Sequence, residues 1–120
     1  MTAVQTAMLM RIFVDEDARY EGAPLFTAIV EELRKCEFGG ATVLKGIEGF
    51  GSHEHVHSAR SVDTVPSLPV LLEVAESEEK IRSIVPRLRE MISDGLITLE
   101  RVEMHVLRSY PPREGRDRGD

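Results

Sequence analysis

The order in which apolar residues change their spacing along the chain restricts the fold more than any other feature. Two segments carry apolar residues at the spacing of an amphipathic helix, residues 24–38 and the stretch between Ser77 and Gly95. Four further segments alternate or contain short β-branched runs, and we predict strands there: residues 8–14, 41–48, 67–76 and 96–107. The predicted order is therefore strand, helix, strand, strand, helix, strand.

The residues at the ends of the two predicted helices agree with this interpretation. Pro24 suits the first turn of the first helix, because proline lacks the N–H that would stay unpaired there. Ser77 can cap the second helix with its hydroxyl. Pro86 lies inside the second helix, and we expect a kink there because its ring removes one backbone hydrogen bond.

Two strand–helix–strand units with right-handed crossovers give a ferredoxin-like α+β sandwich, a four-stranded antiparallel sheet with two helices on one face. We assign this domain to residues 8–108, with a flexible N-terminus over residues 1–7 and a disordered tail over 109–120. The predicted strands 8–14 and 67–76 carry apolar residues on both faces. Because two helices cover only one face, we predict that the other face packs against further copies of the chain.

The composition argues against several classes of protein. A net charge of -6 is unfavourable for binding nucleic acid, since a phosphate backbone attracts a basic face. No apolar run approaches the ~20 residues that cross a bilayer, so we expect no membrane insertion. Cys36 is the only cysteine, and no secretory pattern opens the sequence, which favours the cytoplasm.

The predicted connection between the two middle strands is long for a small domain, and such connections are usually functional or disordered. It contains three of the four histidines. Alternate residues of an extended segment point the same way, so His53, His55 and His57 could present three imidazoles to a divalent metal such as zinc, copper or nickel. The alternatives are a solvated loop and a pH-sensing cluster.

Other candidate groups are less specific. Gly46, Gly49 and Gly51 allow a ligand to approach the backbone closely, but their spacing differs from the phosphate-binding loop and the dinucleotide motif. The acidic run of residues 15–17 is typical of a solvated turn and could also hold a cation. The serines and the single cysteine lack the context of a catalytic nucleophile, so we expect no enzymatic activity.

Three stretches of the sequence resemble one known family: residues 40–53 (GATVLKGIEGFGSH), 68–70 (LPV) and 93–100 (SDGLITLE). They are similar to small bacterial and archaeal proteins of domain-of-unknown-function family 190, which resemble PII signal-transduction proteins. The resemblance covers about residues 8–107. It implies a ferredoxin-like homotrimer without enzymatic activity, whose long connection corresponds to the PII T-loop. That loop changes shape with ligand and docks onto a target protein, for which a membrane transporter or channel is the family-level expectation.

The resemblance also implies a ligand site and its residues. In PII proteins a nucleotide lies between subunits, against the base of the T-loop, the turn before the last strand, and basic residues on and after that strand. The matching residues of this chain are Gly49, Phe50, Gly51, Ser52, Asp94, Gly95, Arg101 and Arg108. PII proteins carry a lysine just after the turn, where this chain has Leu96. The implied effector is a small molecule such as an adenine nucleotide, which orders the loop of residues 49–63.

Overall fold

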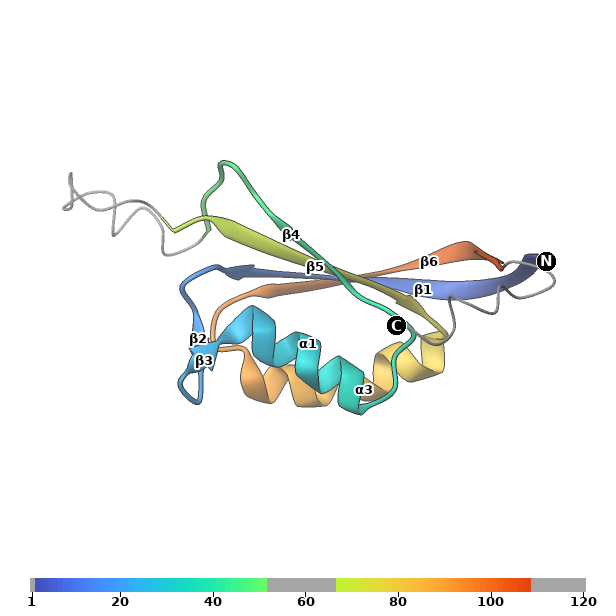
Figure 1. The fold of residues 1–120 in the computed structure, drawn as a ribbon, viewed down its shortest axis with the longest axis horizontal. Helices are drawn as coiled ribbons and strands as arrows, with labels where there is room; N and C mark the ends of the chain where they lie inside the picture. Colours follow the sequence, from blue (N-terminus) through green and yellow to red (C-terminus); the bar gives the residue numbers. More distant parts are fainter. Residues whose placement is uncertain (1, 52–66, 109–120) are drawn as a thin grey trace, which may run out of the picture.

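The structure, a computed structural model, describes residues 2–51 and 67–108. Its main sheet has four strands in the order β4-β5-β1-β6, and every neighbouring pair is antiparallel. The strands are β1 (Thr2–Asp15), β4 (Thr42–Lys45), β5 (Pro69–Glu76) and β6 (Leu96–Leu107). Helices α1 (Leu25–Lys35) and α3 (Glu78–Met91) both lie against one face of this sheet (Figure 1). The predicted ferredoxin-like α+β fold is confirmed.

The core lies between the helices and the face of the sheet that they cover. Helix α1 buries a stripe of residues spaced by four, Leu25, Ile29 and Leu33. Helix α3 buries a similar stripe: Ile81, Ile84, Leu88 and Met91. Strand β1 contributes every second residue from Met8 to Val14, because alternate residues of a strand point to the same face. Burying each of these side chains is worth about 1.5–3 kcal/mol, which keeps both helices on this face.

The second helix starts as the sequence predicts. The Ser77 hydroxyl oxygen accepts a hydrogen bond from the Lys80 backbone N–H at 3.3 Å, which satisfies one of the unpaired donors of the first turn. Glu78 and Glu79 follow in that turn, where negative charge is favourable. The helix then continues through Pro86 as far as Met91.

The N-terminal segment differs from the prediction. Residues 2–7, which we expected to be flexible, are the first half of β1 and pair with the second half of β6, from Thr2 opposite Leu107 to Ala7 opposite Val102. The segment has no strong apolar pattern of its own, so the long partner strand decides its conformation. The predicted tail, residues 109–120, lies outside the described residues.

Two boundaries and one additional element near α1 and β4 also differ from the prediction. Helix α1 stops at Lys35 rather than residue 38, because Glu37 adopts a left-handed backbone conformation with φ of 61°. Strand β4 stops at Lys45 rather than residue 48. Between β1 and α1 the chain forms a small hairpin that we did not predict, β2 (Arg19–Tyr20) and β3 (Ala23–Pro24).

The face of the sheet opposite the helices is apolar at the end where β4 and β5 pair. The strand register places one residue from each strand in a single row across this face: Leu44, Leu71, Phe13 and Leu96. Leu44 is 48% exposed and Leu96 is 57% exposed. The next row is polar, where the Arg11 guanidinium donates to the Glu73 carboxylate at 2.9 Å. No described element covers this face (Figure 1).

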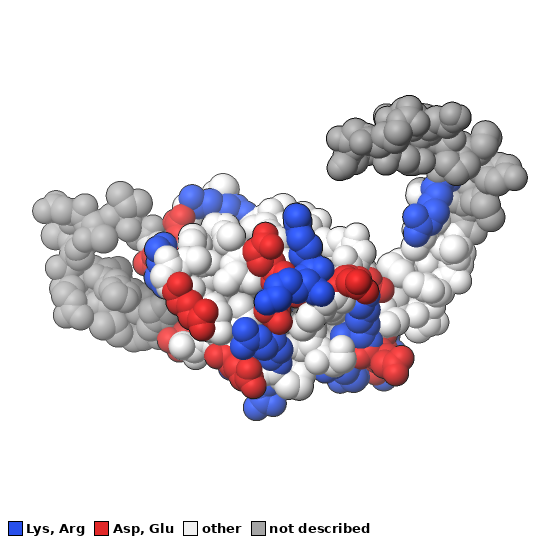
Figure 2. Space-filling model, turned by 60° about the horizontal axis from the view of Figure 1, so that its bottom comes forward, with Lys and Arg blue, Asp and Glu red and all other residues white. Residues whose placement is uncertain are grey.

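The helical side of the molecule is different in character. Figure 2 shows this side, where positive and negative side chains are intermixed over the helices. Several of them form ion pairs, such as Arg82 with Glu78 at 2.8 Å. None of the helices in residues 2–51 and 67–108 has the length and apolar character that a membrane crossing requires.

Candidate ligand-binding site

A cavity of about 410 Å³ lies at the end of the sheet where β1 stops and β5 and β6 begin. This volume falls within the roughly 300–1,000 Å³ of small-molecule sites. The described residues around it come from the end of β1, from the chain just after β4, from the start of β5 and from the turn before β6. They are Phe13, Val14, Asp15, Gly49, Phe50, Gly51, Ser67, Pro69, Asp94, Gly95 and Leu96.

The structure brings together two groups of predicted site residues that are far apart in the sequence. Gly49, Phe50 and Gly51 follow β4, and Asp94 and Gly95 form the turn before β6. All five line the same cavity. Their proximity is a property of this fold, while their role in binding a ligand stays a prediction.

Two glycines after β4 allow this segment to pack closely on Pro69. A Cβ atom at Gly46 would lie 2.7 Å from the Pro69 Cγ, and one at Gly49 would lie 3.0 Å from the same atom. The Gly46 backbone N–H also donates to the Pro69 carbonyl oxygen at 2.7 Å. The segment therefore runs against the start of β5, where Phe50, 90% exposed, borders the cavity.

Gly95 allows the turn before β6, which forms the opposite wall of the cavity, to pack closely on β1. A Cβ atom there would lie 2.8 Å from the Phe13 carbonyl oxygen and 2.8 Å from the Ile92 Cγ2. Real Cβ atoms do not approach backbone oxygens this closely, so a side chain at position 95 would push the turn away from β1.

The walls combine apolar surface with a few polar groups. Phe13, Phe50 and Leu96 offer apolar contacts of the kind that a flat ring can lie against. The Asp15 and Asp94 carboxylates can accept hydrogen bonds from hydroxyl or amino groups. No Lys or Arg is among the described residues of the wall. The described walls thus present apolar surface and two acidic residues.

The two predicted basic residues lie elsewhere in the same chain. Arg101 is in the middle of β6, opposite Met8, and its guanidinium donates twice to the Glu78 carboxylate, at 3.0 and 3.2 Å. Arg108 follows the last residue of β6, at the end of the sheet away from the cavity. Neither is among the described residues that line the cavity, and their role in binding a ligand stays a prediction.

The remaining predicted site residues, Ser52, His53, His55 and His57, lie outside the described residues. Within the described part of the chain, no three His, Cys, Asp or Glu side chains come together as metal ligands would. The fourth histidine, His105, contacts the Glu103 carboxylate on β6.

The acidic run at the end of β1 has a structural partner that the sequence did not indicate. The Glu16 carboxylate forms an ion pair with Lys45 at 2.8 Å and accepts from the Leu68 backbone N–H at 3.0 Å. The Lys45 ammonium, followed by the Leu68 N–H, holds the pKa of Glu16 below its ordinary value. This contact could have been predicted only from the sheet order, in which β5 lies between β4 and β1.

Comparisons with known proteins agree with this fold. The DUF190 family, described as "Uncharacterized ACR, COG1993", matches residues 7–104. The chain belongs to this family. A UPF0166 protein of Aquifex aeolicus is 35% identical over 99 residues, covering 82% of this chain and 93% of that protein. A UPF0166 protein of Methanocaldococcus jannaschii is 33% identical over 104 residues, covering 83% and 91%.

Two solved structures share the fold of this DUF190 protein. A putative PII-like signaling protein from Thermus thermophilus gives a TM-score of 0.60 at 23% identity, covering 84% of this chain and 91% of that one. CPII, a nitrogen regulatory PII-like protein from Thiomonas intermedia bound to ADP, AMP and bicarbonate, gives 0.54 at 12% identity, covering 85% and 98%. The predicted membership of the DUF190 family is confirmed, and the chain shares the fold of these PII-like proteins.

Proposed function

We propose that this protein is a non-enzymatic, PII-like regulator that acts as a homotrimer in the cytoplasm. A small effector, an adenine nucleotide, binds in the cavity beside Gly49–Gly51 and Asp94–Gly95. Binding orders the loop of residues 49–63 and so changes the affinity for a partner protein, such as a membrane transporter. The observation that carries this proposal is that the predicted loop base and the predicted turn line one cavity of ligand size.

The position of the cavity supports a site between subunits. Phe13 and Leu96 line the cavity and also belong to the apolar row on the uncovered face of the sheet. A second copy packed on that face would therefore close the cavity from the side. Its Arg101 or Arg108 would bring the positive charge that the described wall of one chain lacks.

The chemistry of the wall supports a nucleotide with few phosphates. Apolar side chains can hold the base, and the Asp15 and Asp94 carboxylates can accept from ribose hydroxyls. The Asp94 carboxylate also repels additional phosphate charge. CPII, which shares the fold, is bound to ADP and AMP, and this favours the same ligand class here.

Two measurements test the proposal on the purified full-length chain. Sedimentation velocity is expected to give three times the mass of one chain, and isothermal titration with AMP and ADP is expected to give one site per subunit. A monomer at micromolar concentration would refute the trimeric site. A trimer that binds neither nucleotide would remove the nucleotide while leaving the fold assignment intact.

A further inference from the structure

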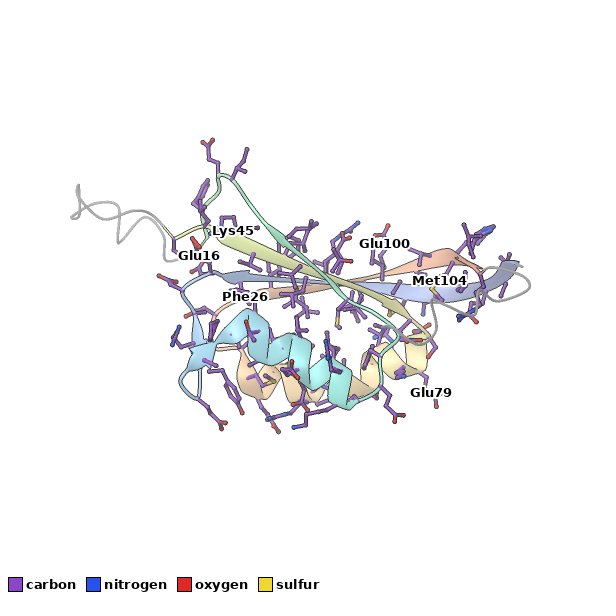
Figure 3. The ribbon with its side chains drawn as sticks, in the orientation of Figure 1. Glu16, Phe26, Lys45, Glu79, Glu100 and Met104 are labelled. Carbon is purple, nitrogen blue, oxygen red and sulfur yellow. The ribbon has the colours of Figure 1, made fainter. Side chains whose placement is uncertain are left out.

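Glu16, the residue directly after β1, contacts both ends of the connection between β4 and β5. Its carboxylate is 2.8 Å from the ammonium of Lys45, the last residue of β4. The same carboxylate accepts from the backbone N–H of Leu68, the residue before β5, at 3.0 Å. The Glu16 backbone N–H in turn donates to the Leu68 carbonyl oxygen at 2.9 Å. Figure 3 shows Glu16 and Lys45 together at this end of the sheet.

Neither Glu16 nor Lys45 lines the cavity, but their neighbours do. Asp15 precedes Glu16, and Ser67 and Pro69 flank Leu68, and all three border the cavity. Glu16 therefore acts on a ligand only through the residues that it holds in place.

A second contact ties the same segments together. The Ser67 hydroxyl donates to the Asp17 carboxylate at 3.0 Å, which adds another link between the end of β1 and the start of β5. The Asp17 contact is exposed, whereas the side chain of Glu16 is only 27% exposed. Surface contacts usually contribute less than shielded ones, and Lys45 is itself 60% exposed, so the partly buried bond from the Leu68 N–H to Glu16 is the main link.

We infer that Glu16 is a positioning residue that fixes both ends of this connection relative to β1 and thereby holds the cavity walls in their ligand-binding arrangement. The inference rests on the proposed function, because it concerns the same nucleotide cavity. Without the Glu16 side chain, the wall residues outside the paired strands, Ser67 and Gly49–Gly51, are held less firmly, and the ligand must order them when it binds. If they adopt the binding arrangement one tenth of the time, the apparent dissociation constant rises about tenfold.

The test compares Glu16→Ala, Glu16→Gln and Lys45→Met with the wild type by titration with AMP. Glu16→Ala is expected to bind about tenfold more weakly with an unchanged sedimentation coefficient. Glu16→Gln is expected to lose less, since its amide oxygen still accepts from the Leu68 N–H, and Lys45→Met loses only the ion pair. Glu32→Gln is the matched control, because Glu32 is a shielded glutamate paired with Arg87 on the helical side.

Amide hydrogen exchange without ligand provides a second measurement. The Leu68 N–H bonds Glu16 directly, and the Gly46 N–H bonds Pro69 next to it. Both amides are expected to exchange faster in Glu16→Ala and at the wild-type rate in Glu32→Gln.

Wild-type affinity together with wild-type exchange in Glu16→Ala would overturn the inference, as would an equal loss of affinity in Glu32→Gln. Should the wild type bind no nucleotide, the proposed function fails. The exchange rates alone then test whether Glu16 positions the two ends of the connection. Faster exchange at Gly46 and Leu68 would then support the inference, and unchanged exchange would overturn it.

Discussion

Replacing Gly95 by alanine is expected to destabilise the protein, although the added group is only one methyl. The new Cβ would lie 2.8 Å from the Phe13 carbonyl oxygen, 2.8 Å from the Ile92 Cγ2 and 3.2 Å from the Val14 Cγ1. The carbonyl belongs to β1, which pairs on both sides within the sheet and cannot move alone. Such overpacking typically costs about 1–3 kcal/mol.

Part of this cost is offset because the substitution also lowers the conformational entropy of the unfolded chain. Alanine has fewer unfolded conformations than glycine, which stabilises the folded protein by about 0.4–1 kcal/mol where the backbone tolerates it. The expected net loss for Gly95→Ala is therefore about 1.3 kcal/mol in the free energy of unfolding, the middle of a range of about 0–2.6 kcal/mol. Gly51 is the matched control on the same cavity, since a Cβ there meets no atom of the described residues within 4 Å.

Urea denaturation followed by circular dichroism measures the difference. All variants are compared at one protein concentration, because the stability of an oligomer depends on it. The midpoint is expected to fall for Gly95→Ala with an unchanged slope, and to stay the same or rise for Gly51→Ala. Equal midpoints for Gly95→Ala and the wild type, or an equal loss in Gly51→Ala, would refute the steric reasoning.

Three further predictions use other parts of the structure. Leu44→Asp on the uncovered face is expected to lower the sedimenting mass, because it would bury a charge in any interface formed there. The control Glu79→Lys, on α3 at the helical side, is expected to leave the sedimenting mass unchanged. Because the pKa of Glu16 is depressed in the folded protein, its carboxylate stabilises the fold at pH values above the ordinary pKa of 4.5, and this stability is lost as the pH falls below 4.5. Between neutral and acidic pH, the free energy of unfolding of Glu16→Gln should therefore fall less than that of the wild type. Asp94→Asn is expected to raise the affinity for ATP relative to AMP in calorimetric titrations, and a fall in that ratio would contradict the proposed repulsion.

The sequence predicted β6 over its full length and β1 only in part, for one physical reason. Apolar residues recur at alternate positions on both sides of Glu100 and Arg101 in β6, whereas residues 2–7 carry no such pattern. They become a strand because β6 offers a partner along their length, from Thr2 opposite Leu107 to Ala7 opposite Val102. Tertiary pairing therefore decides a segment for which local preference is weak.

For the candidate site, the structure shows where some of the predicted residues lie, while their role stays a prediction. The resemblance indicated Gly49–Gly51 and Asp94–Gly95, and the fold places both at one cavity. Glu16 was missed because an acidic run at a strand end is typical of a solvated turn. Its partners, Lys45 and Leu68, are far away in the sequence, and only the sheet order β4-β5-β1 brings them together.

The position of Arg101 links ligand binding to assembly. Within its own chain this guanidinium lies in the middle of β6 and is bound to Glu78, while the cavity at the start of β6 has no basic residue among its described walls. If Arg101 meets a phosphate group in the proposed site, it does so from a second copy of the chain, because within its own chain it lies away from the cavity. Ligand binding and association of subunits are then thermodynamically linked, so that each strengthens the other by the same free energy.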